Sequence, residues 1–256
     1  MSDQKTELGD RFSSEKAFHD AKYAGEDLYP LHYKANPTLH VYQHMRNLMG
    51  DIRGKRVLEY GCGEGWTTCD LAQMGATIDA FDISEQGVTK TKAALTRAGL
   101  SQRCTVRQMA AEQLDYPAET FDLAVGFAIL HHLDVDRALE ALYRVLRPNG
   151  RAIFAEPLGT NPVINLYRRI TPQYRTPDEA PLVLKDFRLQ AKCFSGFEHY
   201  EYYFTALAAL ALLYVPIARR AFGPLNRALC RFDDWFLPRA GRLRSLAWYS
   251  VIVLHK

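Results

Sequence analysis

Short apolar runs alternate with amphipathic segments through the middle of the chain, which is the pattern of a parallel β-sheet with helices on its faces. Strands are predicted over residues 56–60, 77–82, 104–108, 121–127 and 151–156, and helices over 67–74, 85–98 and about 138–146. Gly99 is suited to end the second helix, and Pro148-Asn149-Gly150 is predicted to end the third. The pattern predicts a doubly wound α/β core over about residues 50 to 160.

The flanking regions give weaker patterns. Residues 1–50 are polar and partly helical, and we interpret them as a lid of covering helices. The proline-rich stretch 157–181 predicts loop with a short helix around 164–169, and 197–204 and 247–254 predict two late strands. The chain is therefore expected to form one domain with three parts. These are covering helices (1–50), a ligand-binding core (51–160) and a substrate-side region (161–256) that holds an insertion at 205–243.

A glycine-rich loop follows the first predicted strand in the sequence VLEYGCGEGW. Gly61 permits a tight turn, Gly63 permits a ligand to approach the backbone, and Gly65 permits close packing of helix and strand. Asp82 ends the second strand, where its carboxylate can accept hydrogen bonds from ribose hydroxyls. The pair predicts a nucleoside-bearing cofactor.

Two details favour S-adenosylmethionine over a nicotinamide dinucleotide. The spacing is G-x-G-x-G rather than G-x-G-x-x-G, and Glu59 stands two residues before the first glycine. A carboxylate there would repel a pyrophosphate but would attract a cationic group. S-adenosylmethionine carries a ribose for Asp82, an amino-acid end for the loop and a sulfonium.

Four segments in order resemble the class I S-adenosylmethionine-dependent methyltransferases, especially the branch of ubiquinone/menaquinone-type and small-molecule enzymes. They are VLEYGCGEGW, IDAFDIS, AAEQLDYPAETFDLAVGFAILHHL and RVLRPNGRAIFAEP, within residues 50–160. The resemblance implies a Rossmann-like, doubly wound α/β fold with a seven-stranded sheet whose last strand is antiparallel. The two late strands would complete that sheet, with the helical insertion before the final strand.

The resemblance also implies roles for individual residues. Glu59 would orient the loop or meet the cofactor's amino group, Ile83 would pack on adenine, and Tyr23 of the lid would close over the methionine end. Ala110 stands where relatives usually have an aspartate that accepts from the adenine amino group, so the backbone near Ala111 or a neighbouring side chain must serve. The predicted cofactor-binding residues are Tyr23, Glu59, Gly61, Cys62, Gly63, Asp82, Ile83, Ala110, Ala111, Glu112 and Phe127.

His131 and His132 follow the fourth strand, at the edge where doubly wound sheets bind their ligands. A hydroxyl or ammonium acceptor must lose a proton during methylation, so a histidine there is a candidate general base. Relatives also use such a ring to fix the loop or the cofactor's carboxylate. We assign His131 to the substrate and His132 to the cofactor loop.

Composition limits the alternatives. Of 256 residues, 48% are hydrophobic and 24% are charged, as in an ordinary globular protein. The polar start MSDQKTELGDR lacks the apolar core of a secretory signal, which predicts a cytoplasmic protein. The five cysteines include no C-x-x-C pair, so no disulfide framework and no metal site are expected.

The net charge of +3 is unevenly distributed. Residues 205–256 hold eight basic and two acidic side chains, a balance of +6, together with the apolar run 204–216. A substrate lid, a homodimer face and peripheral membrane contact through 205–243 all suit this composition, whereas nucleic acid suits it least.

The preferred hypothesis is an enzyme that methylates a small, apolar or aromatic molecule at oxygen or nitrogen. A cofactor-binding interaction or regulatory protein on the same fold is the alternative, and a nicotinamide-dependent reductase comes third.

Overall fold

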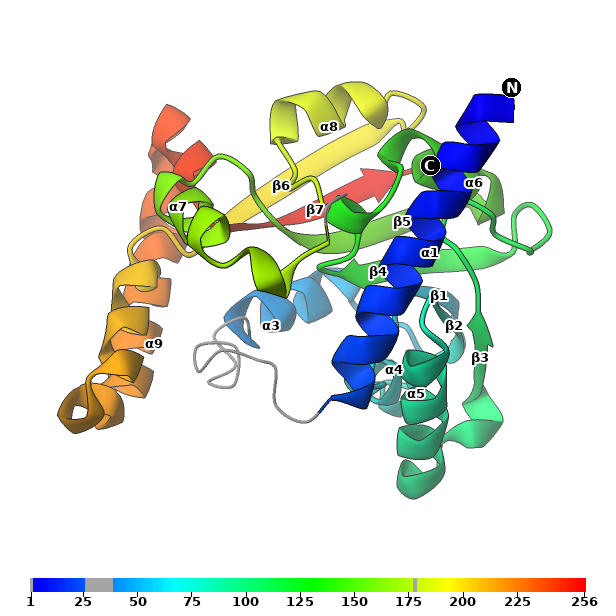
Figure 1. Cartoon of the computed structure of the whole chain (residues 1–256), viewed down its shortest axis with the longest axis horizontal. Coiled ribbons are helices and arrows are strands. Elements are labelled where there is room, and N and C mark those ends of the chain that lie inside the picture. The colour runs from blue at the N-terminus through cyan, green and yellow to red at the C-terminus, as the bar shows by residue number, and fades with distance from the viewer. Residues whose placement is uncertain (1, 26–38, 177–178) are drawn as a thin grey trace.

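Seven strands form one mixed sheet in the order β3-β2-β1-β4-β5-β7-β6 (Figure 1). The computed structural model describes residues 2–25, 39–176 and 179–256. The strands are β1 (Arg56–Tyr60), β2 (Thr77–Asp82), β3 (Cys104–Gln108), β4 (Phe121–Phe127), β5 (Leu146–Pro157), β6 (Gly196–Tyr202) and β7 (Tyr249–His255). The pairs among β1 to β5 are parallel, and β7 is antiparallel to both β5 and β6. The predicted seven-stranded α/β fold with an antiparallel last strand is confirmed.

Both faces of the sheet are covered by helices. The α-helices are α1 (Ser2–Ala24), α3 (Leu39–Met49), α4 (Trp66–Gln73), α5 (Glu85–Ala98), α6 (Val135–Val145), α7 (Pro162–Ile170), α8 (Leu184–Gln190) and α9 (Arg219–Phe236). Val57 and Val125 share one core with α3, α4 and α5, whereas their neighbours Leu58 and Ala124 share the other with α6 and α8. This alternation follows from the two-residue period of a strand and produces the doubly wound arrangement.

The sequence placed most element ends within three residues, and the largest difference is at the start of β5. Ser84 caps α5 by accepting a hydrogen bond from the backbone of Gly87, and Gly99 ends that helix in the left-handed conformation, as predicted. The turn at 148–150 does not end α6, which stops at Val145, and the strand already begins at Leu146. Proline disfavours helical geometry in the residue before it, so the chain is extended before Pro148 is reached.

The insertion between β6 and β7 consists of α9 and short 3₁₀ helices. These are η4 (Ala206–Tyr214), η5 (Pro216–Ala218), η6 (Leu237–Arg239) and η7 (Gly241–Leu246). Asp233 of α9 is buried and accepts hydrogen bonds from the backbone of Phe204, Thr205 and Ala206 and from the Thr205 hydroxyl. One carboxylate thus satisfies the free N–H groups where η4 begins and ties that helix to α9.

The lid helix α1 packs against α5 and runs across the front of the sheet in Figure 1. The carboxylate of Asp20 accepts hydrogen bonds from the Ser84 hydroxyl and the backbone of Gln86, both at the start of α5. The remainder of the predicted lid between α1 and α3, residues 26–38, lies outside the described residues. The described part holds the lid over the carboxyl ends of β1 and β2.

Candidate active site

The glycine loop joins β1 to α4 by close backbone contacts. Gly63 has a φ of 50°, and a side chain there would meet the Tyr23 hydroxyl of the lid at 2.9 Å. Gly65 has a φ of 83°, and a Cβ there would lie 2.9 Å from the backbone of Thr91 in α5. The close packing that the sequence predicted at the third glycine therefore exists, but its partner is helix α5 rather than the strand.

Asp82 joins the end of β2 to this loop. It is buried, and its carboxylate accepts hydrogen bonds from the backbone N–H groups of Gly63 and Ser84, each at 2.9 Å. Each carboxylate oxygen can accept two hydrogen bonds, so both can still accept one from a ligand. Asp82 therefore shapes the loop and also faces the adjoining cavity.

Glu59 lies beneath the loop in β1 and is 2% exposed. Its Oε2 atom is buried without a hydrogen-bond partner among the described residues. Burial, together with the smaller effect of the nearby Asp82, raises the pKa of this carboxyl to about 8. A buried acidic group of this kind would be stabilised by a cation.

The raised pKa predicts a pH-dependent stability. The folded protein holds a proton on Glu59 that the unfolded chain releases near pH 4.5, so stability should fall between about pH 4.5 and about 8. The Glu59→Gln variant should remove about 2–4 kcal/mol of this fall. Urea unfolding of the ligand-free protein across this range measures it. Glu64→Gln, at an exposed loop position, is the matched control, and parallel curves for wild type and Glu59→Gln would contradict the prediction.

A first cavity of about 460 Å³ lies between the lid and the carboxyl ends of β1, β2 and β4. It brings together eight of the predicted cofactor-binding residues, namely Tyr23, Gly61, Asp82, Ile83, Ala110, Ala111, Glu112 and Phe127. Glu59, Cys62 and Gly63 do not line it. The carboxylate of Glu112 accepts a hydrogen bond from the backbone of Asp134, which leaves its other oxygen for a ligand.

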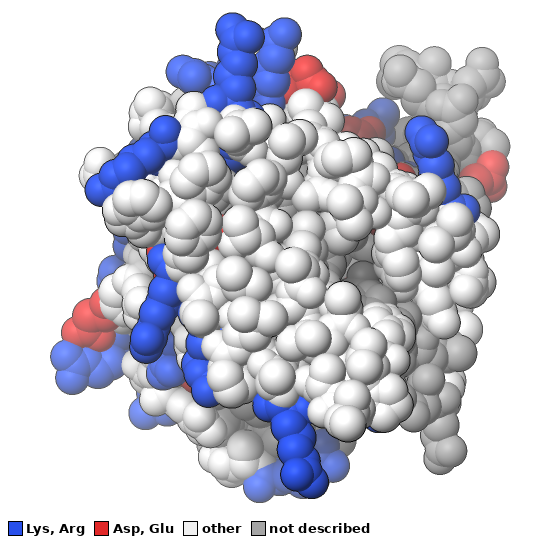
Figure 2. Space-filling model, turned by 90° about the vertical axis from the view of Figure 1, so that its left-hand side faces the viewer, with Lys and Arg blue, Asp and Glu red and all other residues white. Residues whose placement is uncertain are grey.

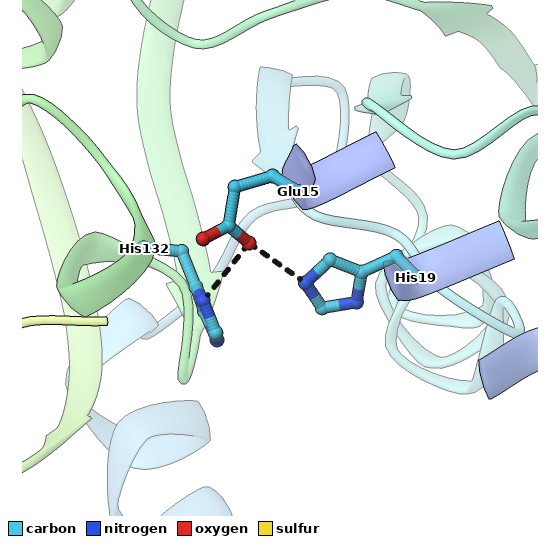
Figure 3. Close-up of side chains that lie close together, drawn as sticks. All are labelled: Glu15, His19 and His132. Carbon is cyan, nitrogen blue, oxygen red and sulfur yellow. Dashed lines mark ion pairs between the residues drawn. The ribbon is translucent and has the colours of Figure 1, made fainter. Parts of the chain in front are cut away.

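Glu15 of the lid lies beside His19 of the same helix and beside His132, which follows β4 (Figure 3). Its Oε2 atom lies 3.4 Å from Nε2 of His19, one helical turn away, and 3.2 Å from Nδ1 of His132. Its other oxygen accepts a hydrogen bond from the Thr176 hydroxyl. The contacts with His132 and His19 and the hydrogen bond from Thr176 lower the pKa of Glu15 despite its burial, so the carboxylate is ionised and ties the lid to the sheet.

These side chains also form a possible ligand set for a metal ion. One ligand atom each from Glu15, His19 and His132 lies within 4.8 Å of the others, and His131, His132 and Glu179 form a second such group. Both groups include His132, so the two sites could not both be occupied through the same nitrogen of His132. The contacts between carboxylate and imidazole explain the arrangement without an ion, and we interpret it as a bridge between lid and sheet.

A second cavity of about 430 Å³ adjoins the first, and its lining combines aromatic side chains with histidines and charged groups. Both cavities are lined by Lys22, Ala128, His132 and Tyr249. Ala128 has a φ of 53°, a left-handed conformation that is unusual for alanine. Backbone strain of this kind is common at functional sites, and Ala128 lies in the wall between the two cavities.

His131 lines only the second cavity and is paired with Glu156 at the end of β5. Its Nδ1 lies 2.8 Å from Oε2 of Glu156, whose Oε1 accepts hydrogen bonds from the backbone of Ile129 and Leu130. Burial lowers the pKa of His131 to about 4 and raises that of Glu156 to about 7. The ring of His131 is therefore neutral near pH 7. Its Nδ1 contacts Glu156, and its Nε2 does not.

Sequence reasoning missed several residues that complete the site. Glu156 follows an apolar run at the carboxyl end of a strand, a signal that could have identified it. Glu15 stands one turn before His19 on the lid, but nothing in the local sequence relates it to His132. The aromatic wall from Tyr42, Trp66 and Tyr249 brings together distant segments that only the fold relates.

The core of the chain is similar in sequence to known proteins. Residues 58–154 match the methyltransferase domain family. An uncharacterized protein of Haemophilus influenzae is 34% identical over 105 residues, which are 40% of this chain and 42% of that protein. The ubiquinone biosynthesis O-methyltransferase of Pseudomonas fluorescens SBW25 is 30% identical over 126 residues, 48% of this chain and 53% of that enzyme. The chain thus spans about half the length of the curated relatives it matches.

Solved structures share the fold at low sequence identity. A putative sarcosine dimethylglycine methyltransferase from Galdieria sulphuraria has a TM-score of 0.62 at 16% identity, with 86% of each chain covered. Phosphoethanolamine N-methyltransferase 2 of Haemonchus contortus, solved in complex with S-adenosyl-L-methionine, also has a TM-score of 0.62 at 16% identity. That match covers 84% of this chain and 51% of the other.

The sheet order, the glycine loop beside a strand-end carboxylate and the matched domain agree with one another. Residues 58–154 are a methyltransferase domain, and the seven-stranded fold is that of S-adenosylmethionine-dependent methyltransferases of known structure.

Proposed function

We propose that the chain transfers the methyl group of S-adenosylmethionine to a small, apolar or aromatic molecule. The observation that carries this proposal is the pair of adjoining cavities. One lies against the glycine loop and Asp82, and the other lies beside His131 and Glu156. His132 lines both cavities, so a group held in one is close to a molecule held in the other.

The residues of the first cavity fit the cofactor. Asp82 has acceptor capacity for ribose hydroxyls, and Ile83 offers an apolar side chain for the adenine ring. The orphaned Oε2 of Glu59 lies beneath the loop, where an ammonium group nearby would stabilise its charge. Bound there, S-adenosylmethionine supplies a methyl group on a sulfonium, which makes the thioether a good leaving group.

The protein's own contribution is positioning, exclusion of water and proton transfer. The lid, held by Glu15, covers the first cavity, and close approach without water accounts for much of the acceleration in displacements of this kind. In the tautomer with the proton on Nδ1, His131 donates a hydrogen bond to Glu156, and Nε2 can take the proton that a hydroxyl or amine acceptor releases. His132 and Glu15 hold the wall between the two cavities.

The lining of the second cavity supports an apolar or aromatic acceptor. Phe18, Tyr167 and Trp248 line it, and its charged groups are Lys22, Arg168, Arg175 and Glu179. Aromatic walls with a few polar groups are typical of small-molecule sites. The similar proteins include an O-methyltransferase and an N-methyltransferase. We favour an oxygen or nitrogen acceptor because His131 then has a proton to accept.

Two measurements test the proposal. Isothermal titration with S-adenosylhomocysteine should show binding. Incubation with S-adenosylmethionine carrying a tritiated methyl group and a cell extract should then label a small molecule. Absence of S-adenosylhomocysteine binding would overturn the proposal. Binding without any labelled product would instead support the alternative, a cofactor-binding regulatory protein, and dinucleotide binding would support a reductase. The cytoplasmic location of the protein and its association into a homodimer are predictions from the sequence that these measurements do not test.

The lid bridge gives a second prediction. The Glu15→Gln variant loses the charged partner of His132, and hydrogen bonds to charged groups contribute about 1.5–3 kcal/mol. We expect the Kd for S-adenosylhomocysteine to rise about tenfold to a hundredfold, because the closed lid is less stable. Ser13→Ala, at an exposed position of the same helix, should leave the Kd unchanged. Equal affinities for Glu15→Gln and wild type would show that the bridge does not control binding.

A further inference from the structure

Helix α7 has an apolar face that is exposed to solvent. Val163, Leu166 and Ile170 are 65%, 61% and 68% exposed, and their spacing places them on one side of the helix. Ile164 and Tyr167, on other sides of α7, line the second cavity. Helix α7 therefore separates the second cavity from an apolar outer surface.

The start of the insertion extends this apolar surface. Tyr214, Val215 and Ile217 of η4 and η5 are exposed, and Ile217 is 93% exposed. The side chain of Tyr214 lies near those of Tyr167 and Tyr174, so this segment adjoins α7. Large apolar side chains that are exposed together on one face commonly mark an interaction site.

Helix α9 adds a second apolar stripe beside a basic one. Leu225, Phe232 and Trp235 are exposed at helical spacing. Arg227 and Arg231, one turn apart, are exposed on an adjacent side of the helix. An exposed apolar stripe flanked by arginines is typical of a helix that lies in a membrane interface.

We call this surface of α7, η4, η5 and α9 the apolar–basic face, and its charge is almost entirely positive. Six arginines of the insertion are exposed, namely Arg219, Arg220, Arg227, Arg231, Arg239 and Arg242. The acids of residues 205–243 are Asp233, which is buried, and Asp234, which lies 2.9 Å from His40. Figure 2 shows this side as a broad uncharged surface with lysines and arginines around it and few acidic groups.

The apolar–basic face is held rigidly to the sheet. Asp233 fixes the start of η4 to α9, and Asn161, which caps α7, donates a hydrogen bond to the carbonyl of Leu246 at the end of η7. Because this surface is already formed, binding to it does not carry the entropy cost of ordering a loop. Among the described residues, no helix is both long enough and apolar enough to cross a bilayer.

We propose that the apolar–basic face docks on the surface of an anionic lipid bilayer, and that the acceptor reaches the second cavity from the lipid. The positive rim matches anionic headgroups, and the apolar centre matches the acyl boundary beneath them. The first part stands on the surface alone, and the second part rests on the proposed function. If a second copy of the chain bound here, its own six exposed arginines would lie against this rim and the two would repel each other. The charge of the face therefore favours an anionic lipid surface over a second copy.

Co-sedimentation of the full chain with phosphatidylcholine vesicles, with and without phosphatidylglycerol, tests the docking. We expect binding that needs phosphatidylglycerol and weakens as salt rises. Each arginine near such a surface strengthens binding about fivefold, so reversing Arg227 and Arg231 to glutamate should weaken it by at least about tenfold. Reversing Arg97 and Arg103, which are exposed outside the insertion, is the matched control and should have little effect.

The apolar part of the face is tested separately. Ile217→Asn should weaken vesicle binding several-fold even where salt has removed the electrostatic part, because the side chain no longer enters the acyl boundary. Leu189→Asn, at a 67% exposed position of α8, is its control. Equal recovery in the supernatant with and without lipid would overturn the docking. So would a lipid-free dimer, seen by sedimentation velocity, that Ile217→Asn dissociates.

The route of the acceptor has its own readout. Tritium from labelled S-adenosylmethionine should appear in the organic-soluble fraction of a membrane extract, and label confined to the aqueous fraction would overturn access from the lipid. Titration with S-adenosylhomocysteine without vesicles keeps the two proposals distinguishable. A chain that binds this ligand but not vesicles disproves the docking and leaves the proposed function standing. A chain that binds vesicles but not the ligand disproves the proposed function, and with it the route of the acceptor, but leaves the docking standing.

Discussion

The His131→Ala variant is expected to transfer methyl groups about 10²–10⁴-fold more slowly than wild type, because general-base catalysis typically contributes that much. His131 lines the second cavity but not the first, so the Kd for S-adenosylhomocysteine should stay unchanged. Single-turnover transfer with saturating cofactor measures the rate. A rate equal to that of wild type would exclude His131 as the base.

The same pair predicts a pH profile. The pKa of Glu156 is raised to about 7, and below that pH its proton can be donated to Nδ1 of His131. Nε2 then carries the remaining ring proton and cannot accept another, so the rate should rise with pH through about 7. Glu156→Gln should lower the rate and remove this step, whereas His132→Ala should mainly weaken cofactor binding.

The Asp82→Ala variant is expected to lose most of its affinity for S-adenosylhomocysteine. Its carboxylate anchors Gly63 and Ser84 and would accept from the ribose, and each hydrogen bond to a charged group contributes about 1.5–3 kcal/mol. Loss of two such bonds corresponds to a rise in Kd of roughly two to four powers of ten. Isothermal titration measures this change.

Two further variants separate binding from folding. Asp82→Asn keeps the shape of the side chain and should bind more weakly than wild type while remaining folded. Asp79→Asn alters the same strand at a carboxylate that pairs with Arg56, and should leave affinity unchanged. Unchanged binding in a folded Asp82→Ala protein would contradict the assignment of the ribose site.

The parts of the fold that were predicted correctly have strong local signals. The apolar run 121–127 became β4, and Gly99 ended α5 where the sequence placed it. The start of β5 was misplaced because Pro148-Asn149-Gly150 has turn composition. Pro148 disfavours helix in the residue before it, and the pairing of Leu146 with Phe121 shows that the chain is already part of the sheet there. Local sequence reports preferences, and strand pairing can override them.

The site was predicted to the extent that it lies on consecutive motifs. Asp82 and the glycines are close in sequence to the elements that hold them, and the two histidines follow a strand. The contact of Glu15 with His132 depends on how the lid crosses the sheet, which neither segment encodes alone. The short helix α7 was predicted, but its exposed face was not. Which side of a helix faces solvent depends on the elements packed around it, and the local sequence does not give these.

The position of β7 between β5 and β6 has a consequence for folding. Strands β1 to β5 follow one another closely, whereas β5 must wait for α7, α8, β6 and the whole insertion before its antiparallel partner is available. Contacts between distant segments form slowly, and the open edge of β5 is a surface on which other chains can pair meanwhile. Refolding should therefore have a late phase in which β6 and β7 join, and during which the protein is most prone to aggregate.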